Sequence, residues 1–165
     1  MLSFICLFSV LMSLKLNQKT RTLISRAKVA RLATVDQKLY PYVVPVVFVF
    51  HENSFFIPLD EKTKTVNPKN LKRVKNIEKN PNVTLLIDKY QNDWKKLFFL
   101  MIHGKAKVID GKNGKIMDKI HKLLVSKYPQ YKKIGIGNSC IKIEPTKVRF
   151  WSNSQKIIQK NSDNF

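Results

Sequence analysis

The segment 61–76, EKTKTVNPKNLKRVKN, holds the residues best suited to binding a ligand, because it carries six lysines and arginines in sixteen positions. Lys62 and Lys64 follow an apolar run that predicts a strand. Lys69 opens a predicted helix, whose free amides and dipole add to the positive field. A phosphate group fits such a place, but a charged surface that contacts only solvent explains the same residues equally well. The segment therefore predicts an anion site without identifying the anion.

Residues for hydrolytic or metal chemistry are scattered along the chain. The histidines His51, His103 and His121 fall in separate predicted elements, and no Gly-x-Ser-x-Gly motif is present. A nucleophile or a metal ion needs several converging partners, so each histidine is interpreted as structural. Cys6 and Cys140 lack the short spacing of a zinc site. The sequence thus identifies no catalytic residue and no metal site.

Composition predicts one globular domain with a strongly positive field. The chain has 165 residues, 44% of them hydrophobic, and a formal net charge of +20. This length is enough to bury a core without disulfides or metals. The charge attracts nucleic acid, anionic lipid and phosphorylated small molecules alike. Because lysines occur from end to end, much of the charge also fits a general surface coating.

The two ends of the chain differ in composition from the rest. Residues 1–16 predict an apolar extension, of which residues 2–14 are too few to span a bilayer. No basic residue precedes this run and no cleavage site follows it, so we expect Met12 to be the natural start. The barrel domain is expected at 17–152 and a polar tail at 153–165. Two cysteines without a disulfide pattern favour a reducing, cytoplasmic location.

Periodicity predicts three helices and six strands, which together form a barrel. The helices are expected at 17–28, 69–79 and 113–126, and the strands at 29–35, 40–50, 54–59, 82–88, 95–110 and 139–151. Asn80 and Pro81 are expected to end the second helix, and Pro145 to interrupt the last strand. Strand and helix do not alternate, which excludes a doubly wound parallel sheet. The predicted fold class is α+β: a mixed, mostly antiparallel β-barrel with helices inserted between strands.

The predicted strand 40–50 is apolar at both odd and even positions. Such a strand is covered on both faces, here by the barrel interior on one side and by a helix or a partner subunit on the other. Pro41 and Pro45 cannot donate to a ladder, so they mark an edge or a bulge. Backbone acceptors at these positions are expected to be open to a ligand.

The order of several segments resembles a known family. VARLATV, YVVPVVF, LKRVKNIEKNPNVTLLID and IHGKAKV together resemble the pyridoxamine 5′-phosphate oxidase-like family, the FMN-binding split barrels, over residues 20–151. The turn DKYQNDW looks like the D-x-Y-x-x-D-W turn of the coenzyme F420-dependent (deazaflavin-dependent) oxidoreductase branch. The resemblance implies a homodimer that binds a flavin or deazaflavin in a groove at the subunit interface.

The resemblance also implies positions for the cofactor contacts. Residues expected along the ring system are Thr34, Val44, Pro45 and Val46. Residues expected at the phosphate are Lys62, Thr63 and Lys64, with Lys69 extending the basic site. Trp94 is expected near the ring or the substrate, from the same or the other subunit.

Two departures from the family pattern bear on the choice of cofactor. Phe99 and Met101 stand where the pyridoxamine phosphate oxidases proper have a flavin-contacting Gln and Arg, before Gly104. Their C-terminal Trp-x-x-x-Arg-Leu-x-Pro signature is reduced to Trp151. The first departure weakens an FMN assignment, and the second argues against pyridoxine phosphate as the substrate. The extra lysines suit coenzyme F420, whose tail is more anionic than FMN.

The resemblance implies an oxidoreductase that moves a hydride between reduced deazaflavin and a small organic substrate. The first alternative is an FMN-binding protein of the same family. The second is a non-enzymatic basic barrel that binds nucleic acid or sequesters cofactor, motivated by the charge and by aromatic residues that could stack on bases. These residues are Tyr40, Tyr42, Phe55 and Phe56. Their alternation favours core positions, so neither nucleic acid nor a membrane is an expected partner.

Overall fold

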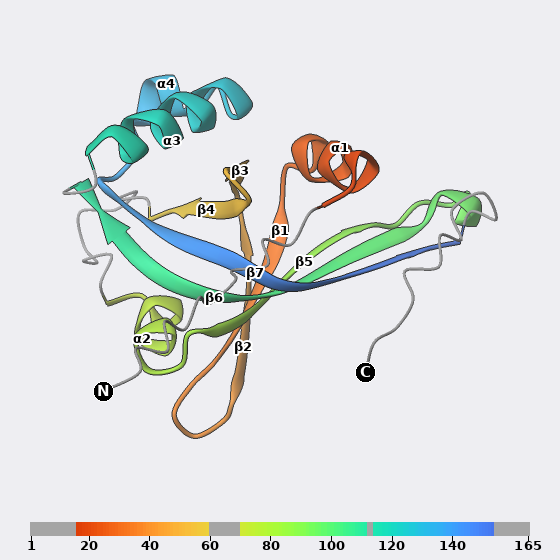
Figure 1. The fold of residues 1–165 in the computed structure, drawn as a ribbon, viewed down its shortest axis with the longest axis horizontal. Helices are drawn as coiled ribbons and strands as arrows, with labels where there is room; N and C mark the ends of the chain where they lie inside the picture. The colour runs from red at the N-terminus through yellow and green to blue at the C-terminus, as the bar shows by residue number, and fades with distance from the viewer. Residues whose placement is uncertain (1–15, 60–69, 112–113, 154–165) are drawn as a thin grey trace, which may run out of the picture.

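The computed structural model describes residues 16–59, 70–111 and 114–153, which form a seven-stranded sheet with short helices (Figure 1). The strands are β1 (Ala30–Val35), β2 (Pro41–Val46), β3 (Val49–His51), β4 (Ser54–Pro58), β5 (Asn82–Lys89), β6 (Phe98–Asp110) and β7 (Ser139–Ser152). The helices are α1 (Gln18–Arg26), α2 (Lys72–Lys79), α3 (Gly114–Lys127), α4 (Tyr131–Ile134) and the 3-10 helix η2 (Trp94–Lys96). Within these ranges no helix is both long and apolar enough to cross a membrane.

The two edge strands of the curled sheet are consecutive in the chain. The strand order is β2-β1-β5-β6-β7-β4-β3, and every neighbouring pair is antiparallel. Between β2 at one edge and β3 at the other lie only Val47 and Phe48. The chain therefore passes directly from one edge of the curled sheet to the other. This architecture confirms the predicted split barrel with helices, and its described strand pairs are all antiparallel instead of mixed.

The main core fills the inside of this barrel. Alternate strand residues point inward, in keeping with the period of two along a strand. Buried strand residues of this core are Leu32, Phe55, Ile57, Leu85, Ile87, Leu100, Ile102, Ile141 and Ile143, and Phe48 joins them from the crossing between β2 and β3. Ile24 of α1 and Val74 and Ile77 of α2 add to the same cluster. The predicted inward face of the second helix is thus confirmed, as are the core positions of Phe55 and Phe56. The core prediction is wrong for Tyr40, which is 68% exposed.

A second apolar cluster lies between α3, α4 and strands of the sheet. Met117, Ile120 and Leu124 of α3 pack with Phe56 and Cys140. The Cys140 thiol lies 3.7 Å from the Met117 sulfur. Burial raises the pKa of Cys140 to about 12, so this thiol stays protonated at neutral pH and has a structural role.

Three boundaries differ from the sequence-based expectation. The predicted strand 40–50 breaks after Val46, where the chain crosses between sheet edges. The predicted strand 95–110 begins only at Phe98, because Asp93 accepts a hydrogen bond from the Lys95 amide and starts η2 instead. Pro145 does not interrupt the last strand. It lies opposite Gly104, next to a bulge in which Thr146 is the extra residue of β7.

The predicted cover on both faces of strand 40–50 is not supplied by the described part of the chain. Along β2, Pro41, Val43 and Pro45 are exposed, whereas Val46 is buried. One side of β2 therefore packs on the barrel and the other faces outward. The apolar outward residues explain why the sequence predicted a doubly covered strand.

Helices α1 and α3 meet at their C-terminal ends, where two lysine side chains contact backbone carbonyl oxygens. Lys127 Nζ lies 3.4 Å from the Ile24 carbonyl oxygen of α1, and Lys28 Nζ donates to the Lys127 carbonyl oxygen over 2.6 Å. Each ammonium group thus lies at the negative end of the other helix. Lys127 Nζ also lies 3.9 Å from the centre of the Phe48 ring.

We expect the replacement Lys127→Met to stabilise the protein at pH 7. Burial, followed by repulsion from Lys28, lowers the pKa of Lys127 from 10.5 to about 8. A lowered amine pKa means that the folded state releases a proton more easily than the unfolded state, so the wild-type free energy of unfolding rises between pH 8 and 10.5. Because Lys127 is partly exposed, we expect Lys127→Met to raise the free energy of unfolding at pH 7 by only about 1 kcal/mol.

Urea denaturation of wild type and Lys127→Met from about pH 7 to pH 10.5 measures this effect. The difference in stability should shrink as pH rises, since the wild-type amine loses its charge in that window. Lys115→Met on exposed α3 surface is the control and should show a constant difference. A Lys127→Met variant that is less stable than wild type at pH 7, or a difference independent of pH, would contradict the assignment.

Candidate functional site

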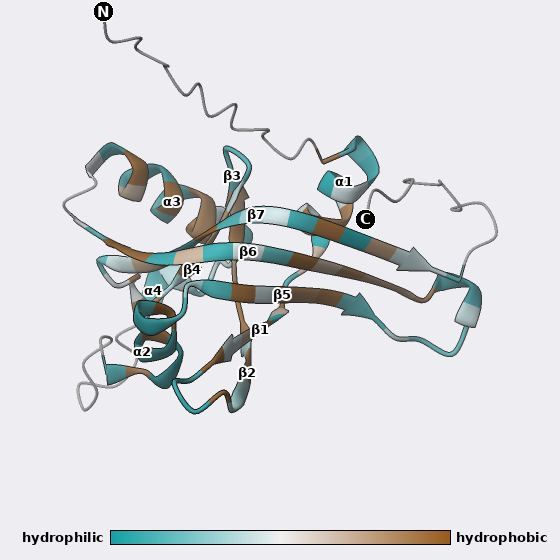
Figure 2. Cartoon of the chain, turned by 60° about the horizontal axis from the view of Figure 1, so that its bottom comes forward, coloured by the Kyte–Doolittle hydropathy of each residue, from teal (hydrophilic) through white to brown (hydrophobic). Residues whose placement is uncertain are grey.

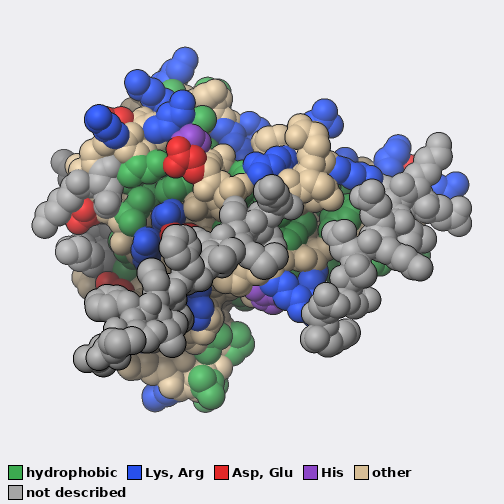
Figure 3. All heavy atoms as spheres, viewed as in Figure 1, with side chains coloured by type: hydrophobic (Ala, Val, Ile, Leu, Met, Phe, Trp, Pro, Cys, Tyr) green, Lys and Arg blue, Asp and Glu red, His purple; other side chains and the backbone are tan. Residues whose placement is uncertain are grey.

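The basic segment is described only from its second half. The predicted phosphate contacts Lys62, Thr63, Lys64 and Lys69 lie outside the described residues. On the face shown in Figure 3, Lys and Arg side chains are spread widely instead of gathering in a single patch. This distribution agrees with a general lysine coating for much of the charge.

The first turn of α2 is tied to the turn between β1 and β2. Lys72 Nζ lies 2.9 Å from Asp36 Oδ2. Asp36 Oδ1 also accepts hydrogen bonds from the amides of Lys38 and Tyr40, at 2.9 and 3.0 Å. The hydrogen bond from Lys72 and then the amide of Tyr40 hold the pKa of Asp36 below its usual value. Lys72 therefore forms an ion pair with this turn, and Asp36 partly neutralises its charge.

Strand β2 places the predicted ring contacts at a sheet edge. Val44 is half-buried, Pro45 is exposed and Val46 is buried. They pair with β1 in the register Leu32–Val44, Arg31–Pro45 and Ala30–Val46. Within the described sheet β2 has no second neighbour, so its far side is open. This placement confirms the expectation that Pro45 marks an edge.

Thr34 on β1 has its side chain turned into the barrel. It is only 1% exposed, and its hydroxyl accepts a hydrogen bond from Asn76 Nδ2 over 3.0 Å. Asn76 itself is buried on α2. The Thr34 hydroxyl therefore positions α2 against β1. The contact with a ring system that the resemblance implies stays a prediction, and Thr34 exposes almost no surface for it within one chain.

Trp94 lies far from β2 in the single chain. It belongs to η2, at the tip of the long β5–β6–β7 extension in Figure 1, and 64% of its surface is exposed. Asn153 Nδ2 donates to the Trp94 carbonyl oxygen over 3.1 Å, which fixes the backbone of the tip. One chain thus brings Val44, Pro45 and Val46 together but does not bring Trp94 to them.

The extension also carries an aromatic pair. We call residues 86–101 and 147–153 the distal arm. Phe99 and Trp151 stack across β6 and β7, with ring centres 5.6 Å apart and an angle of 16° between the planes. Figure 2 shows further apolar residues along the arm strands. Leu86 and Met101 are half-buried neighbours on the same face as this pair. The outward face of the arm is therefore apolar at these four positions, which lie beside the charged residues Asp88 and Arg149.

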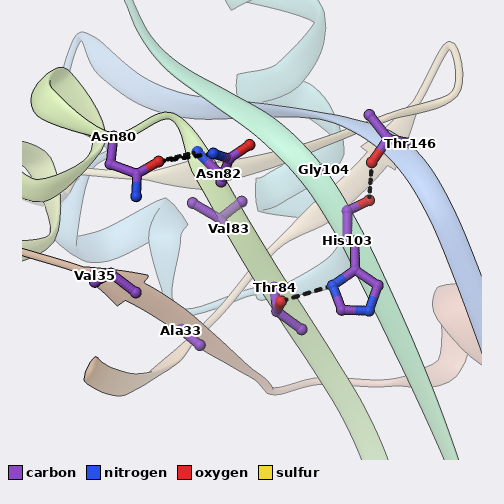
Figure 4. Close-up of a pocket in the computed structure, with 9 residues that line it drawn as sticks. All are labelled: Ala33, Val35, Asn80, Asn82, Val83, Thr84, His103, Gly104 and Thr146. Atoms are coloured by element: carbon purple, nitrogen blue, oxygen red, sulfur yellow. Dashed lines mark hydrogen bonds between the residues drawn. The ribbon is translucent and has the colours of Figure 1, made fainter. Parts of the chain in front are cut away.

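A pocket of about 320 Å³ opens between β1 and β5 (Figure 4). The β1–β5 register ends at the pair Ala33–Thr84, although β1 continues to Val35 and β5 begins at Asn82. The two strands diverge beyond that pair and leave room between them. The residues that line the pocket are Ala33, Val35, Asn80, Asn82, Val83, Thr84, His103, Gly104 and Thr146.

Hydrogen bonds hold the polar side chains of this pocket in place. His103 Nδ1 lies 3.0 Å from Thr84 Oγ1, and the Thr146 hydroxyl donates to the His103 carbonyl oxygen over 3.3 Å. Asn80 Oδ1 accepts from both the backbone amide and the side-chain amide of Asn82, at 3.1 and 3.0 Å. Figure 4 shows the Asn80 Nδ2 group pointing away from Asn82. The pocket is therefore a preorganised polar surface.

Sequence reasoning missed this pocket because its residues come from distant segments. His103 was interpreted as structural, and Asn80 only as a helix end. A usable signal was present, since Asn82 and Thr84 share one face of the predicted strand 82–88. The cross-strand position of His103 depends on the β5–β6 register, which the sequence does not give.

A smaller pocket of about 280 Å³ lies beside α3 and has charged side chains in its lining. Its lining includes Lys107, Lys142 and Glu52. Both lysines lie near Glu144, at 3.7 and 2.7 Å, so their charges are largely compensated. Throughout the described ranges, no three His, Cys, Asp or Glu side chains gather to hold a metal ion.

Several solved protein structures share the fold of this chain. The heme storage protein HutZ of Vibrio cholerae has a TM-score of 0.61 and 14% identity, covering 84% of this chain and 94% of that chain. A conserved hypothetical protein of Mycobacterium tuberculosis has a TM-score of 0.68 and 10% identity, covering 93% and 96%. An FAD-binding protein of Mesorhizobium loti has a TM-score of 0.58 and 15% identity, covering 80% and 89%. No curated protein matches the chain.

The family model for pyridoxamine 5′-phosphate oxidase matches residues 16–152. That span includes every described strand and helix. A family match over most of the chain establishes the relationship, and the split-barrel fold agrees with it. The chain belongs to the pyridoxamine 5′-phosphate oxidase family.

Proposed function

We propose that this protein is an oxidoreductase that binds coenzyme F420, a deazaflavin, in a groove between two copies of the chain. It would transfer a hydride between this cofactor and a small organic substrate, with FMN as the alternative cofactor. The observation that carries the proposal is family membership over residues 16–152. The shared fold of the FAD-binding protein of Mesorhizobium loti supports a ring of the flavin type.

The outward face of β2 fits one side of a flat ring. Val43 and Pro45 are apolar and exposed, and the open edge of the strand leaves backbone groups to bond the rim of a heterocycle. Val44 and Val46 hold this edge against the barrel. An apolar surface beside unpaired backbone groups is the surface that a tricyclic ring with polar edges needs.

The distal arm fits the other side, provided that it comes from a second copy. Its Phe99–Trp151 stack and exposed Trp94 lie away from β2 within one chain. A homodimer that places the arm of one protomer over β2 of the other would cover Val43, Pro45 and the aromatic pair together. Such a dimer would also supply the second cover that the predicted strand 40–50 requires.

The chain would orient the cofactor, exclude water and hold its phosphate. Lys62, Thr63, Lys64 and Lys69 are the proposed phosphate contacts, and the net charge of +20 suits the acidic tail of a deazaflavin. When bound, the cofactor supplies the hydride chemistry itself. The absence of a proposed acid–base pair is therefore compatible with this reaction, and we assign no catalytic residue.

Titration of the purified protein with coenzyme F420 and with FMN tests the proposal. We expect micromolar binding of F420, measured by fluorescence, together with a dimer in light scattering. Val43→Asp should give a monomer and weaken binding at least about tenfold, since the charge would be buried at the interface. The matched control Ile134→Asp, at an exposed residue of α4, should change neither.

Two other outcomes would redirect the assignment. A Soret band on addition of hemin, without binding of either flavin type, would favour heme storage, the function of the HutZ relative with this fold. Binding only to nucleic acid, lost between low and moderate salt, would favour the basic-barrel alternative. Either result, or a tight F420 complex of a monomer, would contradict the proposed interface site.

A further inference from the structure

We propose that the pocket between β1 and β5 is a separate binding site for a small carboxylate with a flat apolar body. Nothing in the proposed cofactor groove requires this pocket, because its polar residues come from the end of α2, from β5 and from the β6–β7 bulge. The site is defined by hydrogen-bond donors at two points of its lining, by a positive surrounding and by an apolar wall.

The donors come from two fixed side chains. Both acceptor contacts of Asn80 Oδ1 are used by Asn82, which leaves the Asn80 Nδ2 group as a pair of donors turned away from Asn82 (Figure 4). His103 Nδ1 lies against the Thr84 hydroxyl, so Nε2 is the ring nitrogen left for a ligand. When Thr84 donates to Nδ1, Nε2 carries the hydrogen and becomes a donor.

The electrostatic surroundings favour a negative ligand. No Asp or Glu is among the described residues that line the pocket. Lys105 Nζ donates to Asn82 Oδ1 over 2.5 Å, which places an ammonium group beside the lining. Lys147 lies directly across the strand pair from His103. The described lining thus holds no carboxylate, and Lys105 and Lys147 lie next to it. These two cations stabilise a bound carboxylate more than they stabilise a neutral group of the same shape.

The size and the walls define the rest of the ligand. Protein ligand pockets begin at about 300 Å³, so a pocket of about 320 Å³ suits a small molecule. Ala33, Val35 and Val83 form an apolar wall along the diverging strands. The gap between two strands is narrow in one direction, which favours a flat body. A benzoate-like molecule combines these properties, with its carboxylate toward the Asn80 Nδ2 group.

NMR titration of the cofactor-free protein with sodium benzoate tests this site. The probe is compared with benzamide, which has the same shape without the charge. We expect benzoate to shift the side-chain amide of Asn80 and the backbone amides of Thr84 and Gly104, with a dissociation constant of about 1 mM. Benzamide should bind at least about fivefold more weakly, because it gains nothing from Lys105 and Lys147.

The variant Asn80→Asp provides the decisive comparison. It keeps the oxygen that accepts from Asn82 but replaces the donor group by a negative oxygen, so benzoate affinity should fall at least about tenfold. Asn138→Asp is the matched control, because Asn138 is exposed near the start of β7 and does not line the pocket. The NMR spectrum of each variant reports its folding directly.

Three results would overturn the site. They are an absence of shifts at up to about 20 mM benzoate, shifts centred on residues outside the lining, and equal affinities for benzoate and benzamide. Since the experiment uses no cofactor, its failure leaves the proposed oxidoreductase function untouched. Conversely, a protein that binds neither F420 nor FMN could still bind benzoate here.

Discussion

Replacing Gly104 by valine is expected to lower the free energy of unfolding by about 3 kcal/mol. A Cβ atom at this position would lie 2.7 Å from the Glu144 carbonyl oxygen and 2.7 Å from Cγ2 of Ile143. The first neighbour is backbone of the adjacent strand, so it cannot rotate away as a side chain can. The substitution must separate β6 from β7 at the bulge opposite Pro145.

Urea denaturation of Gly104→Val, monitored by circular dichroism, measures this loss. Gly114→Ala is the matched control, because a Cβ atom at Gly114, the first residue of α3, would have no described neighbour within 4 Å. There the change should be neutral or stabilising by up to about 1 kcal/mol, since alanine favours a helix. A loss below about 1 kcal/mol for Gly104→Ala and Gly104→Val alike would show that the two strands are not in tight contact.

Removing the hydroxyl of Tyr128 is expected to cost about 2 kcal/mol. The oxygen accepts a hydrogen bond from the Phe48 amide over 3.1 Å. It can donate to the carbonyl oxygen of Phe48 or of Lys28, at 2.9 and 3.0 Å. Burial raises the pKa of Tyr128, so the hydroxyl keeps its proton. In Tyr128→Phe the buried amide of Phe48 loses its partner at the crossing from β2 to β3.

Two measurements separate this local role from general packing. Urea midpoints should shift for Tyr128→Phe with an unchanged denaturant dependence, because the surface exposed on unfolding is the same. Hydrogen exchange of the Phe48 amide should accelerate in the same variant. Tyr90→Phe, at a residue that is 73% exposed, is the control and should change neither. A stability loss below about 0.5 kcal/mol for Tyr128→Phe would contradict the assignment.

The strands could be predicted from sequence because their periodicity is set by burial. The segment 54–59 and the helix carrying Val74 and Ile77 were both recognised from local pattern. The break after Val46 could not be recognised, because a crossing between two edges of one sheet uses the same apolar residues as a continuous strand. It becomes visible only when Tyr128, far along the chain, bonds to Phe48.

The candidate site was only partly accessible for a similar reason. Pro45 at a sheet edge follows from the chemistry of proline, and the structure confirms it. Thr34 was assigned to the ring by position, yet its hydroxyl bonds to Asn76, a partner that depends on how α2 docks. The pocket with His103 depends on the β5–β6 register and on the divergence of β1 from β5. Neither quantity is encoded locally.

The pairing of β4 with β7 has a consequence for synthesis on the ribosome. The β3–β4 hairpin leaves the exit tunnel early, but β4 obtains its second neighbour only when the segment around Ile143 has been made. At about 5–20 residues per second, translation leaves this hairpin waiting for several seconds. During that time Phe55 and Phe56, both buried in the finished protein, remain accessible on the nascent chain. A chaperone that binds apolar hairpins therefore has its best opportunity here, before the last strand arrives.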